Sequence, residues 1–309
     1  MNNITIIGSG SFGCSLSHIL SKNNNNIKIW SYTKEETDMI NNNHKCMFLD
    51  NFYLDESIKC YMDYEQAING SNYIILVTPS SVIRSTCKQI KPYIRGQEII
   101  IASKGMENDK VLSEIVKEEL NLIPSVITGP SHAEQIIKDV PTYVEYSGNK
   151  NINKIFETDK FKLKYNDDLI GIQVGAALKN VITLAVGIVE GLGYESNTVS
   201  YVITEGLEEI KDIAVKLGAK EETIYGLSGL GDLLTTTTSL DSRNKRAGIL
   251  LAQGKTVEEV KKEVGMTIEG LDTLNNACYL INKYNLDCKI IRNLYEIIYK
   301  NKNVNSILD

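Results

Sequence analysis

A glycine-rich segment near the start of the chain could bind the phosphates of a dinucleotide. It reads Gly8-Ser9-Gly10-Ser11-Phe12-Gly13 and lies between an apolar run, Ile4–Ile7, and a segment with helical spacing, Phe12–Leu20. Gly8 would allow a tight turn, Gly10 would let the backbone approach a pyrophosphate, and Gly13 would let the helix pack closely on the strand. The helix N-terminus would then face the phosphates. In this context the pattern predicts a dinucleotide-binding loop rather than a plain glycine turn.

The residues after a second predicted strand, Ile27–Trp30, bear on which dinucleotide binds. A loop specific for NAD usually has an acid at this place, which binds the ribose 2′-hydroxyl. This chain has Ser31-Tyr32-Thr33-Lys34 instead, and the side chains of Ser31, Thr33 and Lys34 could hydrogen-bond to a 2′-phosphate. The sequence therefore favours NADP slightly over NAD. Glu35 and Glu36 follow closely and keep that preference weak.

Three later strand ends carry residues that could face the nicotinamide end of a bound dinucleotide. They are followed by Thr78-Pro79-Ser80, by Ser103-Lys104-Gly105, and by a Gly-Pro-Ser-His-Ala-Glu run over residues 129–134. Ligands of doubly wound sheets bind outside the carboxyl ends of the strands. Lys104 alone would be an ordinary surface lysine, and the Gly-Pro-Ser turn alone would only start a helix. Their shared placement at strand ends favours a site.

Lys179 and Asn180 lie in the middle of an apolar segment rich in small residues, Ile170–Leu192. Burial of an ammonium group is costly, and the alternative is a lysine whose stem packs while its head reaches water. Because the flanking residues are apolar on every side, we favour a catalytic lysine whose pKa is lowered by desolvation and by cationic neighbours. The segment could pass for a membrane span, but its polar residues and glycines indicate a buried core helix.

Two segments further along could contribute to a site, and the second of them could bind an anion. Asp232 follows the glycine turn Gly229-Leu230-Gly231, and the run Asp241–Arg246 offers a helix start rich in cations. Backbone N–H groups, the helix dipole, the Arg243 guanidinium and the Asn244 amide would all favour a phosphate there. Seen alone, a capped and solvated helix start explains this second segment better.

The pattern of strands and helices predicts the scaffold that positions these residues. Strands alternate with amphipathic helices in the first half, which indicates βαβ units and a largely parallel, doubly wound sheet of the Rossmann type. After about Asn166 the strand signals disappear and helices follow one another, with a capping box at Thr256 and Glu259. We predict an α/β protein with a dinucleotide-binding domain over residues 1–166 and an all-helical substrate domain over 167–309. The strands are expected at Ile4–Ile7, Ile27–Trp30, Tyr73–Val77, Ile99–Ala102, Val126–Thr128, Tyr143–Tyr146 and Phe161–Tyr165, and the first helices at Phe12–Leu20, Val82–Ile90 and Val111–Leu120.

Charge and cysteine content exclude several classes of function. The net charge is -6 and the pI about 5.3, without a basic stripe, which argues against a nucleic-acid partner. An anionic substrate would therefore be held by a few local cations. The six cysteines show neither C-x-x-C pairs nor metal-type spacing, and no signal peptide precedes the first apolar run. We expect a cytoplasmic protein with no metal site.

Taken together, these segments resemble the bacterial NAD(P)-dependent glycerol-3-phosphate dehydrogenases nearly end to end. A lone glycine loop would be weak support, whereas an ordered set of motifs is specific. The matching stretches are Gly8–Gly13, Ser103–Gly105, Gly129–Glu134, Gly171–Gln173, Lys179–Val181, Gly229–Asp232, Ser242–Asn244 and Ile268–Gly270.

The resemblance implies an enzyme that interconverts dihydroxyacetone phosphate and sn-glycerol 3-phosphate, forms homodimers and feeds phospholipid synthesis. Lys179 would act as the catalytic acid or base, with Lys104 and Asp232 beside it. The substrate would be contacted by Lys104, Gly129, Ser131, Lys179, Asn180, Asp232, Thr236, Ser242, Arg243 and Asn244. The cofactor NAD(P)H would be contacted by Gly8, Gly10, Ser11, Phe12, Gly13, Tyr32, Lys104, Ala133, Arg243, Thr267 and Glu269.

The chain departs from the family pattern at a few positions. Cys14 stands where the family commonly has Thr or a small residue, and prolines are absent near Leu49-Asp50 and Leu54-Asp55. The tail of the second strand lacks the Arg or His that often follows, which leaves the cofactor preference open. Two rival functions remain: a 3-hydroxyacid dehydrogenase or ketopantoate reductase, and a non-catalytic dinucleotide sensor. The sensor would be expected to lack Lys179, Asp232 or Arg243, and all three are present.

Overall fold

Short, β-branched runs of the sequence form one sheet whose strands lie in the order β10-β9-β8-β5-β4-β1-β2-β3. The computed structural model describes residues 1–239 and 242–309. Neighbouring strands are parallel except for β9, which runs antiparallel to β8. The strands are β1 (Asn3–Ile7), β2 (Asn26–Trp30), β3 (Lys59–Tyr61), β4 (Tyr73–Leu76), β5 (Glu98–Ile101), β8 (Ser125–Thr128), β9 (Thr142–Ser147) and β10 (Phe161–Tyr165).

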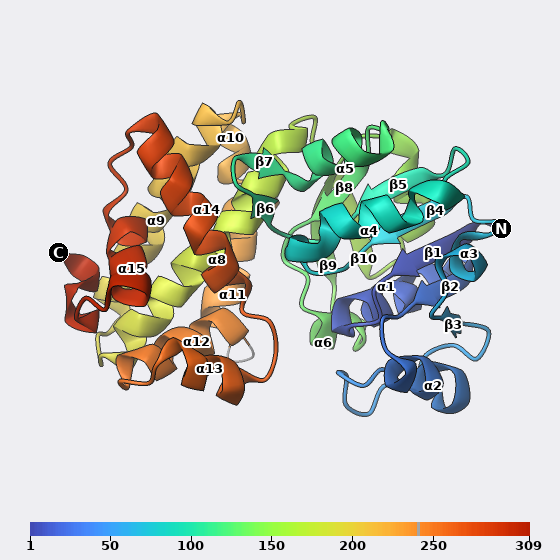
Figure 1. Cartoon of the computed structure of the whole chain (residues 1–309), viewed down its shortest axis with the longest axis horizontal. Helices are drawn as coiled ribbons and strands as arrows, with labels where there is room; N and C mark the ends of the chain where they lie inside the picture. The colour runs from blue at the N-terminus through green and yellow to red at the C-terminus, as the bar shows by residue number, and fades with distance from the viewer. Residues whose placement is uncertain (240–241) are drawn as a thin grey trace. The chain divides into compact units, whose positions relative to one another are not determined.

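The central strands are apolar along their length because helices cover both faces of the sheet. In β1, β4 and β5 each residue after the first is buried. On one side α1 (Ser11–Lys22) packs with α6 (Ala133–Ile136) and α7 (Asn153–Phe156), and on the other α4 (Ile83–Ile90) packs with α3 (Tyr64–Ile68) and α5 (Leu112–Leu120) (Figure 1). Helix α2 (Lys34–Asn43) lies against the edge strand β3. Short 3-10 turns occupy Ser80–Val82, Lys91–Tyr93 and Lys150–Ile152.

The strand order has a topological switch point at β1, because β2 and β4 lie on opposite sides of it. From β1 the chain continues to β2 on one side, whereas β4 lies on the other. In such sheets the loops at the carboxyl ends of the strands beside the switch point form the ligand crevice. The glycine-rich loop after β1 is therefore in the expected place for a dinucleotide.

The predicted doubly wound sheet is confirmed. Each predicted strand is present with ends that differ by at most one residue. Strand β3, helices α2 and α3, and a hairpin formed by β6 (Met106–Glu107) and β7 (Lys110–Val111) were not predicted. The strands missed are three residues long or shorter, so they show neither an apolar run nor a clear alternation. Val111, expected to begin a helix, ends β7 instead.

The chain divides into two compact units. The first contains Met1–Ser103 and Leu112–Leu169, and the second contains Lys104–Val111 and Ile170–Asp309. The second unit joins the small hairpin to a set of helices: α8 (Leu169–Gly191, whose first residue belongs to the first unit), α9 (Ser196–Lys216), α10 (Glu221–Ile224), α11 (Asp232–Thr238), α12 (Arg243–Ala252), α13 (Val257–Val264), α14 (Glu269–Tyr284) and α15 (Lys289–Lys300), with a π-helical turn at Leu227–Gly231 and a 3-10 helix at Val304–Leu308.

Helix α8 is the core of the second unit. It is long and apolar enough to cross a membrane by composition, but its most apolar window is 100% buried inside the protein. The prediction of a buried core helix is therefore confirmed. Glycines let α12 approach it closely, because a Cβ on Gly248 would lie 2.2 Å from the Leu184 carbonyl oxygen.

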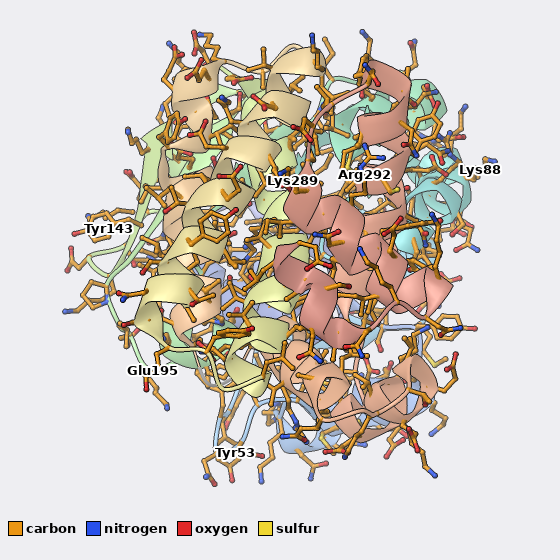
Figure 2. The ribbon with its side chains drawn as sticks, turned by 90° about the vertical axis from the view of Figure 1, so that its left-hand side faces the viewer. Tyr53, Lys88, Tyr143, Glu195, Lys289 and Arg292 are labelled. Atoms are coloured by element: carbon orange, nitrogen blue, oxygen red, sulfur yellow. The ribbon has the colours of Figure 1, made fainter. Side chains whose placement is uncertain are left out.

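The outer helices of this unit are amphipathic. In α15, Ile290 and Ile291 are buried, whereas Lys289 and Arg292 are exposed and project from the face shown in Figure 2. The predicted capping box of α13 is present, with Thr256 and Glu259 satisfying each other's backbone N–H groups. These features are those of a helical domain with one apolar centre and a polar surface.

Candidate active site

Lys179, Asp232 and Lys104 form a buried charged cluster in the second unit. The Asp232 carboxylate bridges the two lysines: Oδ1 accepts from Lys179 Nζ at 2.6 Å and Oδ2 accepts from Lys104 Nζ at 2.6 Å. Asp232 is 1% exposed and Lys179 is 5% exposed. These three side chains together carry one net positive charge, and the Glu269 carboxylate also acts on Lys179. The two ammonium groups are the cations that this cluster offers to an anionic substrate.

Small residues bring the elements of this cluster together. Gly175 lies one helical turn before Lys179 in α8, and a Cβ at that position would lie 3.1 Å from Gly229 Cα in the π-helical turn. This close approach places Asp232, the first residue of α11, beside α8. The glycine turn noted in the sequence is therefore the feature that positions the carboxylate on Lys179.

Thr236 completes the environment of Lys179. It lies one turn after Asp232 on the same face of α11, and its Oγ1 accepts from Lys179 Nζ at 2.5 Å. The Thr236 hydroxyl donates in turn to the Asp232 carbonyl oxygen at 2.7 Å. Two of the three ammonium protons of Lys179 thus have fixed acceptors.

Burial lowers the pKa of Lys179 from 10.5 to about 8. The neighbouring Asp232 carboxylate opposes this by favouring the charged ammonium, whereas the positive charge of Lys104 favours the neutral amine. A lysine in this state can both give and take a proton near neutral pH. The lowered pKa predicted from the apolar sequence around Lys179 is confirmed in direction.

A chain of hydrogen bonds begins at the residue after Lys179. Asn180 Nδ2 donates to Glu269 Oε2 at 2.8 Å, and Asn180 Oδ1 accepts from Asn244 Nδ2 at 3.0 Å. Asn244 Oδ1 then accepts from the Gly270 backbone N–H at 2.8 Å. The chain fixes the side chains of Asn180 and Asn244, and it links α8, α12 and the start of α14. This linkage was not predicted, because its members are far apart in the sequence.

The expected phosphate site at the start of α12 has a capped helix and an exposed arginine. The Ser242 hydroxyl oxygen accepts from the Lys245 backbone N–H, and Arg243 donates to the Thr267 carbonyl oxygen at 3.2 Å. Arg243 and Thr267 are exposed, whereas Ser242 is buried. Asp241, which precedes this helix start, lies outside the described residues. The structure thus brings Arg243, Thr267 and the hydrogen-bonded residues Asn180 and Asn244 to one region of the second unit.

The glycine-rich loop of the first unit has the shape that a dinucleotide needs. A Cβ on Gly13 would lie 2.1 Å from the Gly8 carbonyl oxygen, so α1 packs tightly on the loop, whereas a Cβ on Gly10 would meet nothing within 4 Å. Gly8 has φ +126°, which favours glycine. Helix α1 begins at Ser11, followed by Phe12, and no side chain caps its N-terminus. Open space above Gly10 beside uncapped N–H groups fits a pyrophosphate.

Other residues at the carboxyl edge of the sheet also fit a bound cofactor. Among the described residues, the hydroxyls of Thr78 after β4 and Thr128 at the end of β8 are buried without a hydrogen-bond partner. The Ser103 hydroxyl donates to the Thr78 carbonyl oxygen at 2.5 Å. In the following turn, the Ser131 hydroxyl donates to the Gly129 carbonyl oxygen at 2.9 Å, and Ala133 begins α6. This edge offers unused hydroxyl groups to a ligand.

A carboxylate reaches the end of β2. Glu36 Oε2 accepts from Ser31 Oγ at 3.0 Å and also from Ser9 Oγ, which lies within the glycine-rich loop. The slight preference for NADP rested on Ser31–Lys34, with Glu35 and Glu36 already noted as weakening it, and the contact of Glu36 with Ser31 weakens it further. The sequence does not reveal this contact, because Glu36 lies in the first turn of α2, five residues beyond Ser31. The Tyr32 ring beside it is 82% exposed.

Comparison with known proteins decides the family. Residues 3–153 match the family model described as NAD-dependent glycerol-3-phosphate dehydrogenase N-terminus, and residues 168–309 match the model of the C-terminus. A Fusobacterium nucleatum protein named glycerol-3-phosphate dehydrogenase (NAD(P)+) is 40% identical over 316 residues, which cover 98% of this chain and 94% of that protein. This chain belongs to the NAD-dependent glycerol-3-phosphate dehydrogenase family.

A solved structure supports the same family. Glycerol-3-phosphate dehydrogenase from Coxiella burnetii has a TM-score of 0.96 and 30% identity, with 99% of this chain and 97% of that chain covered. By contrast, a ketopantoate reductase from Ralstonia eutropha has a TM-score of 0.60 and 13% identity, with 92% of this chain and 100% of that chain covered. The second likeness concerns the fold alone. The resemblance to glycerol-3-phosphate dehydrogenases is confirmed, and the rival reductase is not favoured.

Proposed function

We propose that this chain reduces dihydroxyacetone phosphate to sn-glycerol 3-phosphate, and catalyses the reverse oxidation, with NAD(P)H or NAD(P)+. The observation that carries the proposal is the Lys179–Asp232–Lys104 cluster, which offers a proton donor of lowered pKa beside a second ammonium group. Membership of the family supports the same reaction. A catalytically silent sensor would have no need of a buried lysine held in this way.

Lys179 is the acid in the reducing direction. Its ammonium directs two protons to Asp232 and Thr236, and we assign the third to the carbonyl oxygen of the substrate. Proton transfer to this oxygen as negative charge develops on it would complete the secondary alcohol. In the oxidising direction the neutral amine would take the proton back. A pKa of about 8 allows both roles near neutral pH.

Asp232 and Lys104 support that proton transfer. Asp232 holds the Lys179 ammonium in place through a 2.6 Å contact and keeps it partly protonated. Lys104 adds a second positive charge, which favours the developing oxyanion and the anionic substrate. We assign Thr236 to the same end of the substrate, because its hydroxyl contacts Lys179 Nζ.

The phosphate group of the substrate is assigned to the start of α12. Arg243 would supply a guanidinium, and the first turn of α12 would supply backbone N–H groups and the positive end of the helix dipole. Ser242, Asn244 and Asn180 would hold the backbone and amides in position. We also assign Gly129 and Ser131 to the substrate.

The glycine-rich loop of the first unit is assigned to the cofactor. Gly8, Gly10, Ser11, Phe12 and Gly13 would hold the pyrophosphate, and the bound cofactor supplies or accepts the hydride. Further contacts are proposed for Tyr32, Lys104, Ala133, Arg243, Thr267 and Glu269. Residues 1–166 would thus serve mainly cofactor binding, and residues 167–309 substrate binding and proton transfer.

The proposed metabolic role of the enzyme follows from the same reaction. Glycerol 3-phosphate is a building block of phospholipids, so we propose that the enzyme supplies lipid synthesis. We further propose that it acts in the cytoplasm as a homodimer. Size-exclusion chromatography with light scattering would test the dimer, and a mass of one chain, 34.5 kDa, would contradict it.

The decisive experiment measures the absorbance of the reduced nicotinamide at 340 nm. The purified chain should oxidise NADH or NADPH only when dihydroxyacetone phosphate is added. Lys179→Ala should lower kcat by about 100-fold or more while cofactor affinity stays unchanged. Lys211→Ala is the matched control, because Lys211 is another ion-paired lysine of the helical unit and contacts Glu208 and Asp212 instead.

Two results would contradict the proposal. The first is an absence of substrate-dependent oxidation in protein that is folded by circular dichroism. The second is near-normal turnover by Lys179→Ala, which would remove Lys179 from its assigned role. Ketopantoate and 3-hydroxyacids, tested in parallel, should be turned over far more slowly than the phosphorylated substrate.

A further inference from the structure

The carboxylate of Glu36 is fixed beside the glycine-rich loop by contacts from two sides. Its Oε2 atom accepts hydrogen bonds from the hydroxyls of Ser9 and Ser31, which are 4% and 0% exposed. Ser9 lies between the first two glycines of the loop, and Ser31 directly follows β2. The Glu36 backbone N–H donates to the Thr33 hydroxyl oxygen, which caps α2. Both ends of the residue are therefore held.

This place is the one where a Rossmann-type domain meets the adenosine ribose. A carboxylate here accepts hydrogen bonds from the ribose hydroxyls, whereas it repels a 2′-phosphate of charge about -2. Glu36 belongs to a helix rather than to the strand end, but its Oε2 atom contacts both the loop after β1 and the end of β2, where such an acid usually lies.

Of the groups that could have donated to a 2′-phosphate, Ser31 already donates to Glu36, and the other two are contacted by neighbouring residues. Ser31 bonds to Glu36, and the Thr33 hydroxyl oxygen accepts from the Glu36 N–H. The Lys34 ammonium forms an ion pair with Asp38 one helical turn further on and is 78% exposed. A 2′-phosphate at this place would lie next to Glu36 and would compete with it for the Ser31 hydroxyl.

We propose that Glu36 makes this enzyme selective for NAD(H) over NADP(H), by accepting the ribose hydroxyls and repelling a 2′-phosphate. This inference rests on the proposed function only in that the glycine-rich loop binds the cofactor. It replaces the slight preference for NADP that the strand-end residues had indicated. The proposed selectivity is a difference between the binding affinities for the two cofactors, so it can be measured without substrate.

The test is the affinity of the full chain for NADH and NADPH, measured by the fluorescence of the bound nicotinamide. The native chain should bind NADH at least about tenfold more tightly than NADPH, because a neighbouring charge of this kind changes affinities by about 10- to 1000-fold. Glu36→Gln removes the charge but keeps an oxygen that can accept from Ser31. It should tighten NADPH binding and narrow the ratio to about threefold or less.

Glu35→Gln is the matched control. Glu35 lies in the same helical turn and carries the same charge, but its side chain is exposed. Its removal should leave the ratio of the two affinities unchanged. An equal change in both variants would indicate a general effect of net charge and overturn the role of Glu36.

The native chain tests the proposal even if the variants fold poorly. Equal binding of the two cofactors, or tighter binding of NADPH, overturns the selectivity. Either result would leave the proposed reaction intact if oxidation still depends on dihydroxyacetone phosphate. Conversely, selective binding of NADH without any reduction of dihydroxyacetone phosphate would support the role of Glu36 and contradict the proposed function.

Discussion

The lowered pKa of Lys179 leads to a prediction about how the reaction rate depends on pH. Reduction needs the ammonium form, so kcat/KM for dihydroxyacetone phosphate should fall as pH rises through about 8. Oxidation of glycerol 3-phosphate needs the neutral amine, so its kcat/KM should rise through the same pH. The shift from 10.5 to about 8 corresponds to about 3 kcal/mol against the charged form.

Two of the charges that act on Lys179, those of Asp232 and Lys104, should move this midpoint in opposite directions. At an effective dielectric constant of about 20, opposite charges separated by the 2.6 Å of the Lys179–Asp232 contact attract by about 6 kcal/mol, before losses of hydration are subtracted. Measured shifts for neighbours at this range are about 1 to 3 pKa units. Asp232→Asn should therefore lower the midpoint by at least about one pH unit, whereas Lys104→Met should raise it by a similar amount.

The assay is the initial rate of NADH oxidation from pH 6 to 10, with wild type and both variants under identical conditions. Titration of the substrate phosphate is common to the three proteins, so a difference in midpoint between them reports on the protein. Midpoints that shift in the same direction in both variants, or that stay fixed while kcat falls, would refute the assignment of the pH dependence to Lys179.

Three other predictions concern the loop and the helical core. Gly10→Ala should leave the free energy of unfolding within about 0.5 kcal/mol of wild type but weaken NADH binding at least about tenfold. Gly13→Ala should instead destabilise the protein, because its Cβ would lie 2.1 Å from a carbonyl oxygen. Urea unfolding and cofactor titration of both variants separate these outcomes, and equal effects of the two variants would contradict them. Gly248→Ala should cost about 1 to 3 kcal/mol by forcing α12 away from α8, and a urea midpoint equal to wild type would show that the crossing is looser than described. Burial raises the pKa of Glu209, which accepts from two N–H groups at the start of α15, from 4.5 to about 7. Its stabilising contribution is thus complete below pH 4.5 and is lost as pH rises through about 7, a decrease of about 3 kcal/mol that Glu209→Gln should abolish and that unfolding curves at several pH values would detect.

The sequence predicted those features that depend on local pattern. Strands such as Ile4–Ile7 are apolar runs bounded by turn residues, and Lys179 is conspicuous because it lies within a long, mostly apolar helical segment. Both signals lie within a few residues of the feature they predict.

The remaining features arise from contacts between distant segments. Glu36 reaches Ser9 across 27 positions, and Asn180 reaches Glu269 across 89, so no periodicity marks either pair. Strand β3 forms through its pairing with β2 and its packing against α2, because its three residues with one buried side chain carry too little apolar surface to indicate a strand. Such contacts depend on the fold as a whole.

The hairpin between β5 and α5 limits how this protein can be recombined in evolution. Its Met106 and Val111 belong to the apolar core of the helical unit, and Asn276 of α14 donates to the Met106 carbonyl oxygen. Lys104, at the start of the same segment, supplies one of the three charges of the cluster.

A single genetic crossover near residue 167 would therefore separate the helices from part of their own core and from Lys104. Exchange of the dinucleotide-binding half between relatives would succeed only if residues 104–111 were kept compatible with the recipient's helices. The chain passes between the units at residues 103–104, 111–112 and 169–170. We expect natural variation in the hairpin to follow that of α14 rather than that of the sheet on which it is inserted.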